Sequence, residues 1–285
     1  MKFPAFAYAR PGSVCEAIEL LAADEDAKAL AGGQSLLPIL ALRLSSPSLL
    51  VDLGGLDELS RIEVCGGRVH IGAMVTHAHN AASPENLRYI PLIVQALQHV
   101  AHEAVRNRGT LGGSLANADA SAEMPLVMVA LDATMVLAGP DGERTVAADA
   151  FFQGHYSTAI ESGELLIRVE VPFSNLSWAF EEVSRRPGDF ALSMVAAGVR
   201  VEGGYCREAR IVMGGVGDRP LRANEAEDYL VNKRLDADAI GIAAQLAVEP
   251  VKARSDIHAS AEYRRSVTKV LVRRALERTA EGSQS

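Results

Sequence analysis

The stretch Ala31-Gly32-Gly33-Gln34-Ser35-Leu36-Leu37-Pro38 is a glycine turn between two apolar segments. A second glycine turn lies further along the chain, at Asn107-Arg108-Gly109-Thr110-Leu111-Gly112-Gly113-Ser114-Leu115-Ala116-Asn117. Neither turn has the spacing of a Rossmann fingerprint or of a P-loop. Consecutive glycines allow positive φ angles and let backbone N–H groups converge on an anion. Two such turns predict one long anionic ligand held at two places, and a dinucleotide such as FAD has that shape.

Each glycine turn also has an ordinary explanation. A single Gly-Gly pair is common in connectors between secondary-structure elements. Gln34 could cap the helix expected to begin at Leu36 instead of contacting a ligand. Arg106 and Arg108 flank the second turn, where they could attract an anion or lie in solvent. The order and spacing of the two turns, more than either turn alone, favour an anion site.

The composition is that of an ordinary globular protein, with 48% apolar and 22% charged residues among 285. A net charge of −8 argues against nucleic-acid binding, which needs a basic surface. The start shows no signal-peptide pattern, and no apolar run is long enough to span a membrane. Because Cys15, Cys65 and Cys206 are scattered and odd in number, we expect a reducing, cytoplasmic location.

No group of side chains with the spacing of a catalytic or metal site stands out. The absence of a C-x-x-C pair makes an iron–sulfur cluster in this chain unexpected. The histidine pairs His77/His79 and His99/His102 lack the spacing of an H-E-x-x-H zinc site. Neither a nucleophile with an adjacent base nor a carboxylate pair for acid–base work is visible. We therefore expect no catalytic residue and no metal ligand, so that a bound cofactor would bring the chemistry.

Hydrophobic periodicity predicts two lobes in the first part of the chain. The first lobe, residues 1–53, is predicted as a helix followed by a β–turn–α–β unit, at 13–23, 28–31, 36–44 and 49–53. The second lobe, residues 54–175, is predicted to contain a hairpin at 62–71, helices at 91–105 and 122–131, and strands at 134–137 and 165–172.

The character of the sequence changes after Pro172. Three strands are predicted and then three helices, at 178–184, 191–201, 205–213, 223–233, 236–248 and 261–279. Strands followed by helices indicate a separate α+β domain. We expect the boundary at 173–177, which gives domains 1–175 and 176–285, and we expect the tail 281–285 to be disordered.

Five segments carry a resemblance to a known family. The chain resembles the FAD-binding medium subunit of molybdenum hydroxylases, the carbon monoxide dehydrogenase and xanthine dehydrogenase group. The matches run in order at Ala31–Pro38, Ile71–Met74 with Thr76, Val105–Ser114, Arg185–Ala191, and Ala259–Arg264 leading to Val272–Leu276. The resemblance implies an α+β fold, in which a two-lobed type-2 FAD-binding (PCMH-like) domain precedes a small domain with a three-stranded antiparallel sheet and a three-helix bundle.

The family resemblance also implies a function and partners. It implies an oxidoreductase subunit that binds FAD and passes electrons from a [2Fe–2S] small subunit to an external acceptor. Molybdopterin and the [2Fe–2S] clusters are expected only in partner subunits, the former in the large subunit, within a dimer of heterotrimers. Two alternatives stay open: a stand-alone FAD oxidoreductase of the same fold, and a non-catalytic assembly subunit.

By the same resemblance, the two glycine turns hold the diphosphate and nearby ribose or ribityl groups. Glu123 stands where the family has an aspartate that accepts from the ribose hydroxyls, and Phe190 lies near the flavin ring unless it is a core residue like Trp178. Ala101 and Val105, on the predicted helix, border the adenine, as does Leu166. The full set of expected FAD-binding residues is Ala31, Gly32, Gly33, Gln34, Ser35, Leu36, Ala101, Val105, Gly109, Thr110, Leu111, Gly112, Gly113, Ser114, Ala116, Glu123, Leu166 and Phe190.

Two further features follow from the resemblance and from charge. Some relatives carry a lysine near the flavin where this chain has Glu181, whose charge would disfavour an anionic reduced flavin unless it points away. The predicted helix 261–279 is rich in Lys and Arg, and its basic face is either solvated or a docking surface for an acidic partner.

Overall fold

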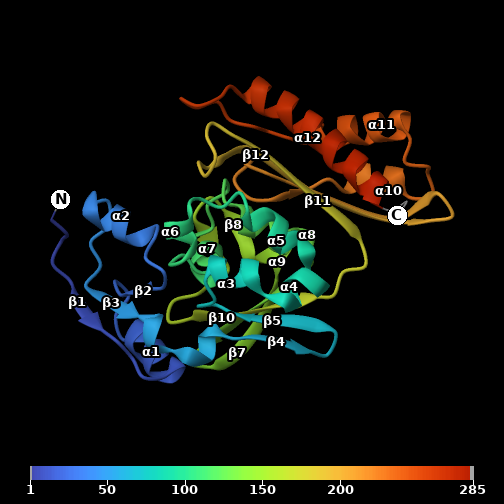
Figure 1. The fold of residues 1–285 in the computed structure, drawn as a ribbon. Helices are drawn as coiled ribbons and strands as arrows, with labels where there is room; N and C mark the ends of the chain where they lie inside the picture. The colour runs from blue at the N-terminus through green and yellow to red at the C-terminus, as the bar shows by residue number, and fades with distance from the viewer. Residues whose placement is uncertain (1, 283–285) are drawn as a thin grey trace.

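The first lobe is a small parallel sheet, as the computed structural model of residues 2–282 shows (Figure 1). Its strand order is β1-β3-β2, and both neighbouring pairs are parallel. The bounds are β1 Ala7–Ala9, α1 Val14–Ala22, β2 Lys28–Leu30, α2 Leu36–Ala41 and β3 Leu49–Asp52. The predicted β–turn–α–β unit is therefore confirmed, whereas β1 was not predicted. Helix α2 is shorter than predicted because Arg43 has a φ of 57°, which ends a right-handed helix.

The second lobe is built on a five-stranded antiparallel sheet in the order β4-β5-β10-β6-β7. Its strands are β4 Ile62–Cys65, β5 Arg68–Gly72, β6 Thr134–Gly139, β7 Gly142–Ala147 and β10 Leu165–Pro172, and a small pair is formed by β8 Phe152–Gly154 and β9 Ser157–Thr158. Short helices cover the sheet: α3 His77–Ala82, α4 Pro84–Tyr89, α5 Pro91–Leu97, α6 Glu103–Arg106, α7 Leu111–Asn117, α8 Glu123–Ala130 and α9 Ala148–Phe151.

The helix predicted over residues 91–105 is wrong, because it divides into α5 and α6. Ala101 has a φ of 43°, which no continuous right-handed helix accommodates. The Arg106 guanidinium stabilises the break by donating to the carbonyls of Val100 and Ala101 at 2.8 and 2.9 Å. Arg106 therefore has a structural partner and does not lie free in solvent.

The C-terminal domain is a four-stranded antiparallel sheet in the order β11-β12-β13-β14, covered by three helices (Figure 1). The bounds are β11 Ser177–Ser184, β12 Ala191–Glu202, β13 Tyr205–Gly214, β14 Leu221–Arg222, α10 Asn224–Leu230, α11 Ala237–Val248 and α12 Ala261–Gly282. The prediction of three strands missed β14, whose two residues are too short to show a period. Helix α12 includes part of the tail predicted to be disordered, and residues 283–285 lie outside the described residues.

The sheet of the C-terminal domain lies between two cores. Alternate strand residues point to opposite faces. Trp178, Phe180 and Met194 join the core of the second lobe, whereas Ala179 and Val195 join the core formed with the helices α10–α12. One face of this sheet therefore closes the core of the second lobe, and Trp178 is a core residue, as predicted.

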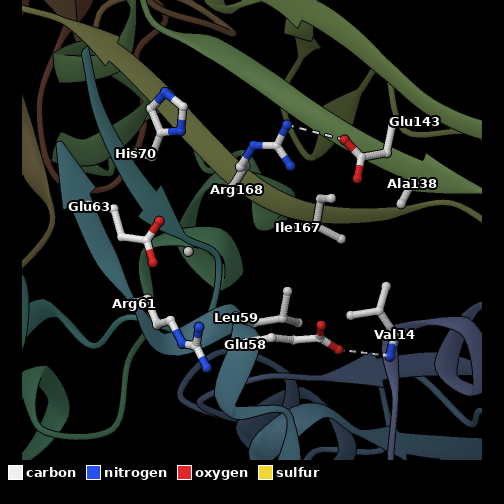
Figure 2. A pocket seen from close by; sticks show the side chains of 11 residues that line it. Val14, Glu58, Leu59, Arg61, Glu63, His70, Ala138, Glu143, Ile167 and Arg168 are labelled. Atoms are coloured by element: carbon white, nitrogen blue, oxygen red, sulfur yellow. Dashed lines mark hydrogen bonds and ion pairs between the residues drawn. The ribbon is translucent and has the colours of Figure 1, made fainter. Parts of the chain in front are cut away.

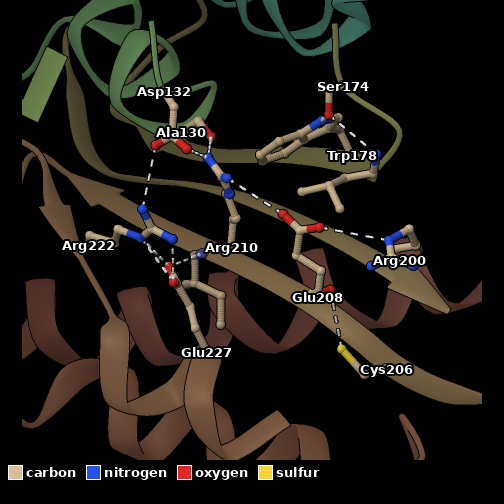
Figure 3. Close-up of polar contacts among 12 residues, drawn as sticks. Ala130, Asp132, Ser174, Trp178, Arg200, Cys206, Glu208, Arg210, Arg222 and Glu227 are labelled. Carbon is tan, nitrogen blue, oxygen red and sulfur yellow. Dashed lines mark hydrogen bonds and ion pairs between the residues drawn. The ribbon is translucent and has the colours of Figure 1, made fainter. Parts of the chain in front are cut away.

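Polar contacts fix the two domains to each other (Figure 3). Asp132, just after α8, pairs with Arg210 of β13 and with Arg222 of β14. Arg222 also pairs with the buried Glu227 at 2.9 Å. On the linker, the Trp178 indole donates to the Ser174 hydroxyl at 2.7 Å. These contacts hold β11–β14 in a fixed position over α8. None of the helices in residues 2–282 has the length and apolarity that crossing a membrane requires.

Candidate functional site

The two glycine turns are in direct contact. A Cβ placed on Gly32 would lie 2.1 Å from the carbonyl oxygen of Arg108 and 2.9 Å from the Cα of Gly109. A Cβ on Gly113 would lie 3.3 Å from that of Ala31. Such close backbone approach is possible only without a side chain. The two turns therefore meet in space, as one shared site requires, and Figure 1 shows α2 of the first lobe beside α6 and α7 of the second.

The first turn presents unpaired backbone donors. The N–H groups of residues 32–35 make no hydrogen bond within residues 2–282. Gly33 has a φ of 73°, and its carbonyl accepts from Leu37 as α2 begins. Ser35 is the N-cap residue but forms no side-chain capping bond. The Gln34 amide donates to the Gly32 carbonyl at 3.1 Å, so it braces the turn and does not cap the helix. Four free donors at a helix start form an anion-binding surface.

The second turn differs from its prediction as a second anion-binding loop, because most of it is the start of α7. Thr110 is the N-cap, and its hydroxyl accepts from the Gly113 N–H at 3.1 Å. The N–H groups of Leu111 and Gly112 donate to the carbonyls of Val75 and Ala73 at 2.9 and 2.8 Å. These donors are occupied, so they are not available to an anion. The Ser114 hydroxyl remains at the partly exposed surface.

Gly112 and His77 explain why the second turn is rigid. A Cβ on Gly112 would lie 2.5 Å from the Cβ of Ala73, so glycine permits α7 to pack on the segment after β5. His77 is 5% exposed, and its ring lies against Gly109. Its Nδ1 is buried without a hydrogen-bond partner among the described residues. Burial, and then the nearby charge of Arg106, lower the pKa of His77 to about 4.

The other predicted residues are divided between surface and core. Phe190 is 66% exposed, on the loop between β11 and β12, so its interpretation as a core residue is wrong. Leu166 is 3% exposed and packs in the core of the second lobe, where it has almost no surface for a ligand. Ala101 and Val105 lie in the broken segment, close to the second turn, and Ala116 is exposed on α7. Gly188 of the Phe190 loop approaches the Ala101 carbonyl.

Glu123 begins α8 and is 7% exposed. Burial, opposed by its own backbone N–H and assisted by the charge of Asp119, raises the pKa of Glu123 to about 7. Glu181 pairs with Arg278 of α12, and the charges of both act on His99 of the second lobe. Sequence analysis missed the adjacent Glu182, although alternation along a strand would have placed it on the opposite face from Glu181.

The cavity in Figure 2 is a different place from the glycine turns. It has a volume of about 430 Å³ and lies where the first lobe meets the five-stranded sheet. Arg168 lines it and pairs with Glu143 at 3.2 Å and with Glu170 at 3.0 Å. None of the predicted FAD-binding residues lines this cavity. In the part of the chain that the structure describes, no three His, Cys, Asp or Glu residues are arranged to hold a metal ion.

The residues at the two turns fit a dinucleotide. A Cβ at Gly32 would prevent the contact between the turns, and free N–H groups lie beside that contact. The donors are neutral and directional, which suits the two negative charges of a diphosphate bridge.

Comparison with known proteins also points to a FAD-binding protein, with matches along most of the chain. The family described as "FAD binding domain in molybdopterin dehydrogenase" matches residues 4–174. The family described as "CO dehydrogenase flavoprotein C-terminal domain" matches residues 178–279. The nicotine 6-hydroxylase medium subunit of Paenarthrobacter nicotinovorans is 41% identical over 276 residues, covering 97% of this chain and 98% of that subunit. The carbon monoxide dehydrogenase medium chain of Afipia carboxidovorans is also 41% identical over 276 residues, covering 96% of each.

Solved structures have the same fold. A chain of quinoline 2-oxidoreductase from Pseudomonas putida 86 superposes with a TM-score of 0.98 at 50% identity, covering 100% of both chains. A chain of the Cu,Mo-CO dehydrogenase superposes with a TM-score of 0.96 at 39% identity, covering 99% of both chains.

Proposed function

The chain belongs to the family of FAD-binding medium subunits of molybdenum hydroxylases, and on that basis we propose that the FAD diphosphate binds where the two glycine turns meet. The observation that carries this proposal is the row of four N–H groups at residues 32–35, which lack partners in the described chain and adjoin the second turn. These groups would donate to the phosphate oxygens, with the N-terminal end of α2 adding a favourable dipole. Ser114 would add a hydroxyl donor from the facing surface.

The ends of the ligand extend away from the turns. We assign the ribose hydroxyls of the adenosine to Glu123, and the adenine to the region of Ala101 and Val105. Phe190 is exposed next to the broken segment, so it is available to an aromatic ring. Leu166, Leu111 and Gly112 are buried. They would contribute to the site by packing in the core beneath it and not by contact with FAD.

The chain is the flavoprotein subunit of an oxidoreductase. Bound FAD supplies the redox chemistry, which is electron transfer. The chain's own residues bind the diphosphate, orient the nucleotide and exclude water from its buried side. We propose that electrons come from a [2Fe–2S] small subunit and leave to an external acceptor. The three cysteines of this chain are fewer than the four thiolates that a [2Fe–2S] cluster uses.

The assembly around the chain is a further part of the proposal. It comprises a molybdopterin-binding large subunit and a [2Fe–2S] small subunit, paired as a dimer of heterotrimers in the cytoplasm. Within the chain we assign residues 1–175 to the FAD-binding domain, with lobes 1–53 and 54–175, and residues 176–285 to the C-terminal domain. The linker around Ser174 separates β10 from β11 and supports this boundary.

Helix α12 offers one place for a partner. Part of its basic face is already occupied: Arg264 is buried and donates to the Leu192 carbonyl at 2.6 Å, and Arg278 pairs with Glu181. Arg273 and Arg274 are exposed. If this face docks an acidic subunit, reversing both charges will lower the yield of the copurified complex, and an unchanged yield would exclude this face.

The experiment that tests the function is purification of the protein with its copurifying subunits. We expect one FAD per chain, with molybdenum and iron in the same complex. Flavin without molybdenum and iron would favour the stand-alone oxidoreductase. A folded, pure protein that neither contains nor takes up FAD would favour the assembly subunit and overturn the proposal.

A further inference from the structure

One buried arginine of the C-terminal domain contacts three separate segments of the chain. Arg264, in the first turn of α12, is 6% exposed. Its Nη1 donates to the carbonyls of Leu192 and Gly215 at 2.6 and 3.1 Å. Its Nη2 donates to the Asp256 carboxylate at 2.6 Å. The guanidinium therefore fixes the start of β12, the residue after β13 and the loop before α12 relative to one another.

Thr268, one turn further along α12, binds the same part of β12. Its hydroxyl donates to the Arg264 carbonyl at 2.6 Å and lies 2.7 Å from the Ser193 hydroxyl. Because a hydroxyl has a single proton to donate, Ser193 is the donor in the second of these bonds. Thr268 and Ser193 are both completely buried. We call Arg264 and Thr268 the α12 clamp, since together they bind two consecutive residues of β12.

The residues that the α12 clamp holds come directly after the loop 185–190. The middle of this loop lies against the second lobe, because a Cβ on Gly188 would be 3.0 Å from the Ala101 carbonyl oxygen. At the start of the loop, the Arg185 Nη1 donates to the His258 Nδ1, just before α12, at 3.0 Å. The loop is therefore fixed on one side by the elements around α12 and on the other by the break at Ala101.

The α12 clamp also reaches the FAD-binding domain through Gly215. The Gly215 carbonyl accepts from Arg264, and the Gly215 N–H donates to the Ala120 carbonyl of the second lobe at 2.9 Å. Gly215 has a φ of 73°, and a Cβ there would lie 3.1 Å from the Leu192 carbonyl oxygen, so glycine permits this close arrangement. Ala120 lies in the connection between α7 and α8, shortly before Glu123. A single residue thus links the clamp to the segment that leads to Glu123.

The chemistry of Arg264 is suited to fixing positions. A buried guanidinium paired with a carboxylate adds little net stability compared with apolar packing. Two of the three acceptors of Arg264 are backbone carbonyls, which locate the chain and bring no charge. The planar fork of arginine holds acceptors at separate places, whereas a lysine ammonium is a single point on a flexible stem. Arginine is therefore the side chain that can join these segments.

We propose that Arg264 and Thr268 are positioning residues of the FAD site, because they fix the loop of Phe190 and the segment of Glu123 in one relative placement. They act through the backbone that carries these two residues and make no contact with FAD themselves. The inference rests on the proposed function, which makes Phe190 available to an aromatic ring of FAD and assigns Glu123 to the ribose.

Two variants weaken the α12 clamp at different points. Arg264→Lys keeps a positive charge beside Asp256 but loses the fork, and Thr268→Val keeps the shape but loses both hydroxyl bonds. We expect FAD affinity to fall by about tenfold in Arg264→Lys and by about threefold in Thr268→Val. At saturating FAD we also expect both to change the visible circular dichroism of the flavin. A variant that is only less stable would keep the wild-type spectrum once saturated.

Arg222→Lys is the matched control in the same domain. Arg222 holds the buried Glu227 at 2.9 Å and also pairs with Asp132, and neither partner is assigned to FAD. Arg210 keeps its own pair with Asp132 in this variant. We expect Arg222→Lys to melt at a lower temperature than wild type, with the FAD affinity and the flavin spectrum of wild type.

The test is FAD titration of the full chain, followed by flavin fluorescence, with thermal melts of the same preparations. Folded Arg264→Lys and Thr268→Val proteins that match Arg222→Lys in FAD affinity and flavin spectrum would overturn the inference while leaving FAD binding intact. If Arg264→Lys does not fold, Thr268→Val decides: weaker binding with an altered spectrum supports the inference, and wild-type values overturn it. If the wild-type protein does not bind FAD at all, the proposed function fails instead.

Discussion

The two glycine turns have similar sequences but use their backbones differently. In the first turn the N–H groups of residues 32–35 are free, within the described chain, and Gly33 has a positive φ. In the second turn the N–H groups of Leu111, Gly112 and Gly113 are bound inside the protein. The first turn is therefore the part that can bind an anion. The second turn packs against the first and has no free N–H at Leu111, Gly112 or Gly113 to offer a ligand.

This difference shows that a Gly-Gly pair has two separate uses. At Gly33 it gives a positive φ that exposes donors. At Gly112 it removes a side chain that would collide with Ala73. Changes in the first turn should therefore act mainly on FAD binding, and changes in the second mainly on stability.

The largest effect on binding is expected from Gly32→Ala. Its new Cβ would lie 2.1 Å from the Arg108 carbonyl oxygen, so the turns must separate. Such overpacking costs roughly 2–3 kcal/mol, which corresponds to a loss of FAD affinity on the order of 100-fold. The loss of FAD affinity is measured as the FAD content of the purified variant. Gly241→Ala, with open space around it on α11, is the control and should keep full FAD content; equal FAD content in the two variants would contradict direct contact between the turns.

The next effect concerns His77 behind the second turn. Its pKa of about 4 lies below the usual 6.5, so the unfolded chain takes up a proton that the folded chain excludes. Stability is therefore complete above about pH 6.5 and is lost progressively down to about pH 4, by on the order of 2–3 kcal/mol. Chemical denaturation at several pH values measures this loss. His77→Leu should lose less between these limits, and an identical loss in both proteins would show that another group is responsible.

Gly33→Ala sharpens the comparison because it has a control with matched strain. Gly33 and Gly67 have φ angles of 73° and 76°, so the backbone strain of alanine at either position costs about 1–2 kcal/mol of stability. We expect both variants to melt at lowered temperatures, Gly33→Ala at the lower one because its Cβ would also lie 2.9 Å from Leu37 Cδ1. Only Gly33→Ala should also weaken FAD binding, by about tenfold, since only this glycine aims donors at the ligand. Equal FAD affinity in the two variants would remove the first turn from the site.

The smallest effect is expected at the cap of the second turn. Thr110→Ala removes the bond to the Gly113 N–H, at a cost of about 1 kcal/mol of stability. FAD affinity should fall less than in Gly33→Ala, because no donor to the ligand is lost. Thr110→Ser keeps the oxygen and should restore stability in thermal melts. A larger effect on FAD binding than on stability would contradict the division of roles between the turns.

Sequence patterns predicted the elements that have a clear period or a glycine stop. The parallel unit 28–53, the hairpin around Gly66, and the long strands and helices of the C-terminal domain are of this kind. The patterns failed where tertiary contacts override local preference. The apolar stretch 91–105 has helical spacing throughout, but the Arg106 side chain stabilises a break at Ala101.

The site was predicted to the level of segments and not of atoms. The sequence predicted one ligand held by both turns but not their direct contact. It also did not predict the internal use of the Gly112 N–H, because its acceptor Ala73 is distant in sequence. Of the two adjacent glutamates, the one that faces the second lobe is Glu182, and only the alternation of β11 distinguishes it from Glu181. Leu166 matched a family position but is enclosed by the core.

The most direct test of this account is amide hydrogen exchange of the folded protein with and without FAD. We predict that the N–H groups of residues 32–35 exchange rapidly without FAD and become protected when FAD binds. Those of Gly112 and Gly113 should be protected in both states, because their acceptors belong to the protein. Unchanged exchange at residues 32–35 in a protein saturated with FAD would contradict the account, because the diphosphate would then be held elsewhere.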